Sequence, residues 1–173
     1  GKNITAYDRT SDRSFGGYFD TEYFTSKDGA DFRAHRLILQ SSARLTDRIM
    51  FNAEIEYEYG AQLNGGNNDT DGQIKIEQAW VDYKFSDALI QRTGIVVVPF
   101  GRLNVLHDSD VRDATNRPVY AKKVVPTTWM DTGVGAHGVL DFDETEVTYE
   151  AYMLNGLQDS STVSISGGIR GAR

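Results

Sequence analysis

One 32-residue segment, residues 100–131, carries charged side chains of both signs. Opposite charges that face each other across a water-filled opening set up a transverse field, and rings of Arg or Lys favour anions. In a loop on an outer surface the same charges would form ion pairs with each other. The sequence leaves both interpretations open. The cations are Arg102, Arg112, Arg117, Lys122 and Lys123, and the acids are Asp108, Asp110, Asp113 and Asp131.

A second polar set shares one face of an expected strand. The side chains of Arg48, Asn52, Glu54, Glu56 and Glu58 alternate with apolar ones, so same-face neighbours lie about 6.6 Å apart. Glutamates this close repel unless water, cations or basic groups face them. They suit the wall of a water-filled lumen, and they suit equally the solvated face of a soluble sheet. Basic residues of adjacent strands are plausible cross-strand partners, namely Arg33, Arg36 and Arg48.

Motifs for catalysis, metals and nucleotides find little support. Residues 133–138 satisfy G-x-G-x-x-G, but a strand and a turn are expected after them instead of a helix. Glycines there more plausibly relieve crowding on a sheet. The three histidines, His35, His107 and His137, lack metal-ligand spacing. The Asp-containing stretch 60–72 lacks the pattern of a calcium loop, and no catalytic triad can be isolated. We therefore expect neither an enzyme nor a cofactor nor a metal.

The elements that would position these residues are strands. Residues 48–59 alternate strictly between apolar and polar, which predicts a strand of roughly 40 Å. That length is enough to cross a bilayer at a tilt. Helical periodicity is confined to a short turn at 108–114. The sequence thus predicts an all-β protein, with further strands at 14–24, 32–42, 73–85, 89–99, 132–140 and 147–154 and an eighth at 163–169.

The alternation breaks at three places. In 73–85 the apolar phase of Ala79, Val81, Tyr83 and Phe85 conflicts with Ile74 and Ile76, which predicts a β-bulge or an extension of the strand above the membrane. Residues 95–98 are apolar on both phases. In the second strand Arg33, His35 and Arg36 blur the pattern, so their faces stay unassigned.

The connections between the expected strands sort by length. Short turns at 43–47, 86–88 and 141–145 alternate with long segments at 60–72, 100–131 and after Asn155, with one short exception at 25–30. Short turns on one side and long loops on the other are typical of a transmembrane β-barrel.

Composition agrees with this class. The net charge of −7 argues against nucleic acid as a partner. A mean hydropathy of −0.45 excludes helical membrane proteins, whereas barrel strands average out as hydrophilic because lipid-facing and lumen-facing side chains alternate.

The middle of the chain resembles the phosphate-selective porin O and P family of bacterial outer-membrane channels. The resemblance covers roughly Phe15 to Arg173. It rests on Glu77-Gln78-Ala79-Trp80-Val81-Asp82-Tyr83, Ser86-Asp87-Ala88, Gly94, Val98-Pro99-Phe100-Gly101-Arg102, His107-Asp108, Arg117-Pro118, Asn155-Gly156 and the glycine-rich residues 167–173.

The resemblance implies an antiparallel barrel of about 16 strands, often a homotrimer, with one long loop folded into the lumen as a constriction. Here that loop is Phe100 to Asp131, and its charges listed above, apart from Asp131, would form the constriction. The single partial barrel domain would span residues 1–173 and supply about half of the wall. Open edges in lipid would leave backbone groups unsatisfied, so we expect a longer chain or another chain to complete it. A closed eight-stranded barrel is the alternative.

The expected function is passive diffusion of small hydrophilic solutes, including anions such as phosphate, through a porin in the outer membrane of a Gram-negative bacterium. Its surroundings would be outer-membrane lipid and lipopolysaccharide. Two other functions stay open: a structural or adhesive outer-membrane barrel without a conducting pore, and a soluble β-sandwich that binds carbohydrate.

Overall fold

A single antiparallel sheet makes up most of the computed structural model, which describes residues 12–60, 72–111, 117–123, 128–157 and 168–172. For β8, Lys122 and Lys123 it describes the backbone alone. Each strand pairs with the next along the chain, in the order β1 to β8. The strands are β1 (Arg13–Ser26), β2 (Gly29–Arg44), β3 (Ile49–Glu58), β4 (Gln73–Ser86), β5 (Leu89–Val97), β6 (Met130–Phe142), β7 (Thr145–Leu154) and β8 (Gly168–Ala172).

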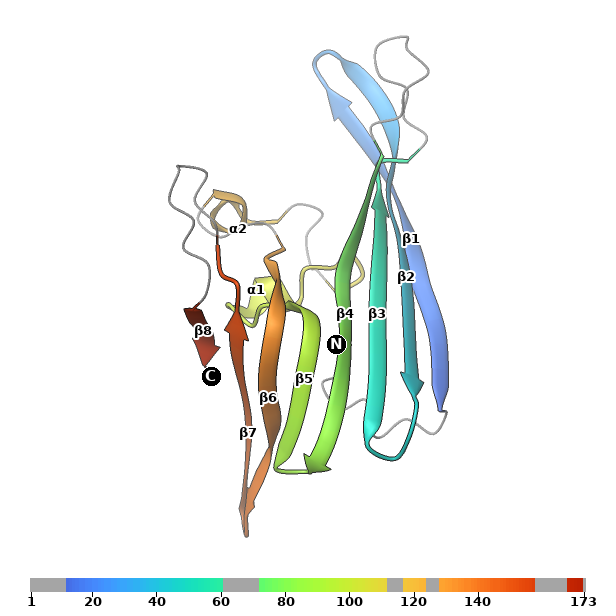
Figure 1. Ribbon diagram of the computed structural model, residues 1–173. Coiled ribbons are helices and arrows are strands. Elements are labelled where there is room, and N and C mark those ends of the chain that lie inside the picture. Colours follow the sequence, from blue (N-terminus) through green and yellow to red (C-terminus); the bar gives the residue numbers. More distant parts are fainter. Residues whose placement is uncertain (1–11, 61–71, 112–116, 124–127, 158–167, 173) are drawn as a thin grey trace.

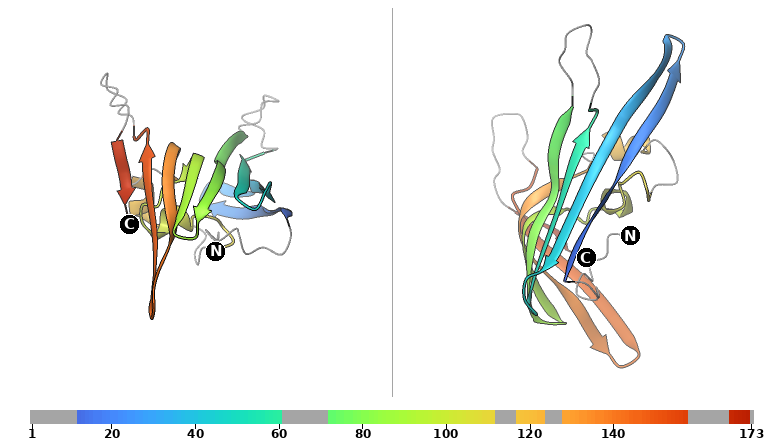
Figure 2. Two further views of the ribbon diagram at one scale, coloured as in Figure 1. Left: turned by 60° about the horizontal axis from the view of Figure 1, so that its bottom comes forward. Right: turned by 90° about the vertical axis from the view of Figure 1, so that its right-hand side faces the viewer.

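The sheet curls into an open half-barrel, with its concave side turned toward the segment that links β5 to β6 (Figure 1, Figure 2). Within the described residues β1 and β8 are the two edges and do not pair with each other. The expected all-β, porin-type architecture is therefore confirmed, and the alternative of a closed eight-stranded barrel is wrong for this chain.

The seven strands expected between residues 14 and 154 are confirmed to within a few residues at each end. Most of the expected eighth strand lies outside the described residues, and β8 overlaps only its last two positions. The short helical turn expected at 108–114 is not seen in its described part, because residues 108–111 form a turn without regular helix, and 112–114 lie outside the described residues. The helices are instead α1 (Arg102–Val105) and α2 (Val119–Lys123), and neither could cross a membrane.

The two faces of the sheet differ as period-two alternation requires. In β3 the side chains of Met50, Glu54 and Glu56 are buried on the concave face, while Ile55 between them is exposed on the convex face. The convex face collects large exposed apolar groups from several strands. Among them are Phe15, Phe19, Tyr23, Leu39, Ile74, Ile76, Val81, Tyr83, Phe85 and Met153.

Two β-bulges explain two of the broken alternations. The β3–β4 register shifts where Glu54 pairs with Gln78 and Ile55 with Ile76, so Glu77 is the extra residue. Apolar residues before and after the bulge thereby reach the same convex face, as the sequence predicted. In the β1–β2 ladder Asp20 pairs with Arg36 and Thr21 with Ala34, which makes His35 extra. Both His35 and Arg36 are consequently buried.

The third irregularity reflects an apolar core on the concave face. Val96 and Val98 are buried there together with Trp80, Trp129 and Tyr152. Residues 95–98 are apolar on both phases because this stretch packs against the β5–β6 segment on one side and shows an apolar face on the other. Gly135 on β6 leaves room in the same region, since a Cβ at this position would meet the ring of Tyr152.

Candidate functional site

Hydrogen bonds among Val98, Asn104 and Trp129 join the two ends of the segment between β5 and β6, and this group of contacts is called the clasp below. Val98 N donates to Trp129 O at 3.0 Å. Asn104, buried on α1, donates through Nδ2 to Val98 O at 2.7 Å and Trp129 O at 3.0 Å, and its Oδ1 accepts from Trp129 N at 2.7 Å. One amide side chain therefore holds the two ends of the segment together.

From this clasp the segment reaches across the concave face to strands that are not its own. His107 Nε2 lies 2.9 Å from Glu77 Oε2 on β4. Tyr18 on β1 donates to Asp108 Oδ1 at 3.4 Å and accepts from Ser109 N at 3.3 Å. The described part of the segment is thus fixed against the inner wall at both β4 and β1.

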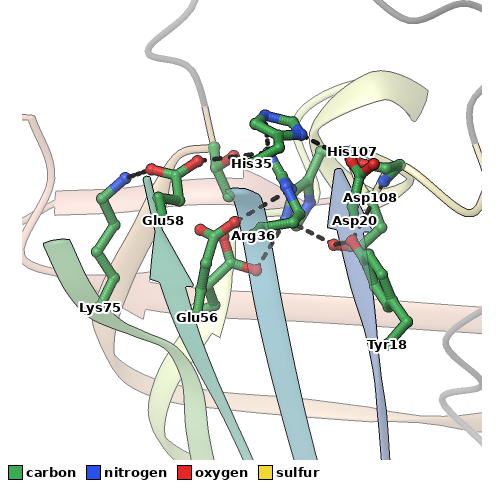
Figure 3. A network of polar contacts seen from close by, with 12 residues as sticks. Tyr18, Asp20, His35, Arg36, Glu56, Glu58, Lys75, His107 and Asp108 are labelled. Atoms are coloured by element: carbon green, nitrogen blue, oxygen red, sulfur yellow. Dashed lines mark hydrogen bonds and ion pairs between the residues drawn. The ribbon is translucent and has the colours of Figure 1, made fainter. Parts of the chain in front are cut away.

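The wall behind it carries a network of ion pairs (Figure 3). Arg36 on β2 lies 3.1 Å from Glu56 Oε1 and 3.4 Å from Glu58 Oε1, both on β3. Glu58 also pairs with Lys75 on β4. Gln78 Nε2 donates to Glu54 Oε2 at 2.8 Å. Arg36 is therefore one of the cross-strand partners that the glutamates of β3 were expected to have.

His35 extends the network on β1 and β2. Its Nδ1 lies 2.7 Å from Asp20 Oδ2 and 3.5 Å from Glu22 Oε1, and its Nε2 lies 3.3 Å from Arg36 Nη2. Because a guanidinium can only donate, Nε2 accepts and the ring proton sits on Nδ1, where it is donated to Asp20.

A second buried cluster lies on β4, β5 and β6. Arg92 donates to both oxygens of Asp82, each at 2.7 Å, and His137 Nε2 lies 3.1 Å from Asp82 Oδ2. The guanidinium also stacks 3.6 Å from the ring centroid of Trp80. This bidentate geometry rigidifies the wall.

The predicted site residues of the β5–β6 segment end up in different environments. Arg102 and Asp110 are exposed, whereas Asp108 is buried against Tyr18. Arg117 donates to Thr128 Oγ1 at 2.8 Å and to His107 O at 3.4 Å. Arg112 and Asp113 lie outside the described residues, and Lys122 and Lys123 have only their backbone described, in α2.

Arg102 and Arg117 come together at a cavity of about 110 Å³ inside the segment. It is also lined by Phe100, Tyr120 and Thr128.

The predicted wall residues lie closer together. Asn52, Glu54, Glu56 and Glu58 share the concave face of β3. Arg48 has the same phase but is exposed in the turn before β3.

Sequence reasoning missed Tyr18, Glu77, Asn104 and His107 as groups that fix the segment. The one available signal was the broken alternation in 73–85, because it marks the bulge that turns Glu77 inward. G-x-G-x-x-G at 133–138 lies within strand β6, which removes its nucleotide-binding interpretation.

Comparisons with known proteins point to one family. The model of the family described as "Phosphate-selective porin O and P" matches residues 13–167. An "Uncharacterized protein" of Aquifex aeolicus (strain VF5) is 33% identical over 148 residues, which is 84% of this chain and 32% of that protein. The chain thus spans about a third of the length of this curated relative. No solved structure matches the chain.

Proposed function

Because the chain belongs to the phosphate-selective porin O and P family, we propose that it forms wall and constriction of a channel for passive diffusion of small hydrophilic solutes. Membership implies a porin in the outer membrane, and a channel rather than an enzyme. The observation that carries the proposal is the attachment of the β5–β6 segment to Glu77 and Tyr18 on the concave face. A segment held there narrows the space that the barrel encloses.

The convex face supports the same proposal. Its exposed aliphatic and aromatic side chains would meet outer-membrane lipid and lipopolysaccharide, as the outward band of a transmembrane barrel does. Assembly as a homotrimer belongs to this proposal too.

Selectivity for anions is proposed to come from the segment rather than from the wall. The wall cations Arg36, Lys75 and Arg92 each face a carboxylate, so their charge is largely balanced. Arg102 is exposed on the segment and, with Arg112, Arg117, Lys122 and Lys123, is proposed as the positive side of the constriction. Asp110 and Asp113 would be the negative side. Asp108 is proposed to anchor the segment instead.

Reversal potentials in planar bilayers under a salt gradient test this assignment. Replacing the five cations by Glu should shift the reversal potential toward cation preference. As a control, Lys27→Glu makes the same charge change as each single one of the five substitutions, but at an exposed ion pair in the β1–β2 turn, and should leave selectivity unchanged. Unchanged selectivity in the five-fold variant would refute the assignment. A folded barrel, judged by heat-modifiable migration, that conducts no ions would instead favour a structural or adhesive role.

A further inference from the structure

Three side chains of the wall and the β5–β6 segment meet in a fully buried place. Glu77 comes from β4, and His107 and Asp108 come from the segment. Their side chains are 1%, 0% and 4% exposed. One nitrogen or oxygen from each lies within 4.8 Å of the others. The sequence spacing of the histidines gave no hint of this group, because Glu77 and His107 are brought together by the fold.

The two ring nitrogens of His107 both face hydrogen-bond acceptors. Nδ1 lies 2.9 Å from the carbonyl oxygen of Asn104, so Nδ1 carries a proton and donates it. Nε2 then faces Glu77 Oε2 at 2.9 Å. A bare ring nitrogen and a carboxylate both accept, so this contact requires either a second ring proton or a cation that binds both atoms.

A neighbouring carboxyl group adds to this requirement. Glu56 on β3 pairs with Lys75 of β4, two residues before Glu77. Glu56 is buried, and its Oε1 makes no hydrogen bond although Arg36 Nη1 lies 3.1 Å away. The carboxyl groups of Glu56, Glu77 and Asp108 are thus all buried. Buried carboxylates are costly unless protons or cations compensate them.

We propose that this place is a divalent-cation site that binds Zn²⁺ through His107 Nε2 and the carboxylates of Glu77 and Asp108, with Glu56 beside it. One imidazole and several carboxylates suit Zn²⁺, and tetrahedral ligands at about 2.1 Å lie roughly 3.4 Å apart. The distance from His107 Nε2 to Asp108 Oδ1 is 3.5 Å, and the distance from Nε2 to Glu77 Oε2 is 2.9 Å, so the second pair would separate by about 0.5 Å when the ion binds. The backbone carbonyl that holds Nδ1–H orients the ring as partners of metal-binding histidines do.

A partly buried histidine–carboxylate group supplies a comparison. Asp20, Glu22 and His35 also bring three donor atoms within 4.8 Å. There, however, both ring nitrogens are accounted for, because Arg36 donates to Nε2 and Nδ1–H donates to Asp20. This group needs no cation.

A bound ion would join β4 to the β5–β6 segment and add a cross-link to the clasp at Asn104. Binding requires the folded wall but no ion current, so a failure of this inference leaves the proposed conduction untouched.

Metal analysis of the full chain, folded in detergent, stripped with EDTA and reloaded with ZnCl₂, tests the site. The unmodified protein should retain stoichiometric Zn²⁺ after dialysis. His107→Gln and Glu77→Gln should each lower the affinity by about 100-fold or more, since even the partners of metal ligands are worth 10–100-fold. His35→Gln should bind as the unmodified protein does.

Cobalt spectra of the unmodified protein make the test independent of how the variants fold. Added Co²⁺ should give the intense visible bands of a four-coordinate site, and Zn²⁺ should displace them. The inference is overturned if the unmodified protein retains no Zn²⁺ and shows no such bands. It is also overturned if folded His107→Gln binds Zn²⁺ normally, or if His35→Gln is the variant that loses it.

Discussion

Replacing Asn104 by Ala should release the β5–β6 segment from its clasp while leaving the sheet intact. The side chain makes three hydrogen bonds, all to backbone atoms of the two ends of the segment. Val98 O still accepts from Phe100 N, and Trp129 O still accepts from Val98 N. Trp129 N–H is the group that loses its acceptor.

The cost follows from these contacts. A buried N–H without an acceptor costs about 1–3 kcal/mol, and each of the two other lost hydrogen bonds contributes about 0.5–1.5 kcal/mol. Closure of the segment should therefore weaken by about 2–6 kcal/mol. Since 1.4 kcal/mol is a factor of ten in an equilibrium constant, even the lower bound raises the open population about 30-fold.

Limited trypsin digestion of the folded protein measures this population, because cleavage follows it when opening is fast. Arg112, Lys122 and Lys123 are cleavage sites within the segment. Asn104→Ala should be cut there at least about 30-fold faster, whereas Asn155→Ala, which changes an exposed amide, should be cut at the original rate. A change of less than about threefold in Asn104→Ala would refute the role of the clasp.

Three further predictions test the wall. Arg92→Met should cost about 3–5 kcal/mol of unfolding free energy in a urea titration, because Asp82 stays buried without its bidentate partner. Adding Asp82→Asn should recover part of that loss, and no recovery would contradict the pairing. Val81→Arg on the convex face should cost about 2–4 kcal/mol in a bilayer, whereas Asn52→Arg at the same height on the concave face should fold normally, so equal losses would contradict the assignment of faces. Gly135→Ala should cost about 1–3 kcal/mol by overpacking the ring above it, and an unchanged unfolding midpoint would contradict that contact.

The strands could be predicted from the sequence because alternation is a local property. Residues 48–59 place Glu54 and Glu56 on one face without any knowledge of their neighbours. The same logic located the phase change in 73–85 and gave a bulge as one of two explanations, beside an extension of the strand above the membrane, and the register shift at Glu77 decides for the bulge.

The contacts that fix the segment could not be predicted in this way. Glu77 and His107 lie thirty residues apart, and no periodicity links them. Asn104 looks like any polar residue of a loop, and its role depends on the approach of Val98 and Trp129. The faces of His35 and Arg36 could not be assigned from the sequence, because the register shift at Thr21 depends on how β1 and β2 pair and not on either strand alone.

The bulge at Glu77 changes the phase of the alternation along β4. After the bulge the odd-numbered residues Val81 and Tyr83 face outward, and before it the even-numbered residues Ile74 and Ile76 do. Deletion of Glu77 would therefore reverse the faces of residues 73–76, so that both isoleucines would point inward and Lys75 toward lipid. A single deletion there should therefore be less tolerable than most substitutions.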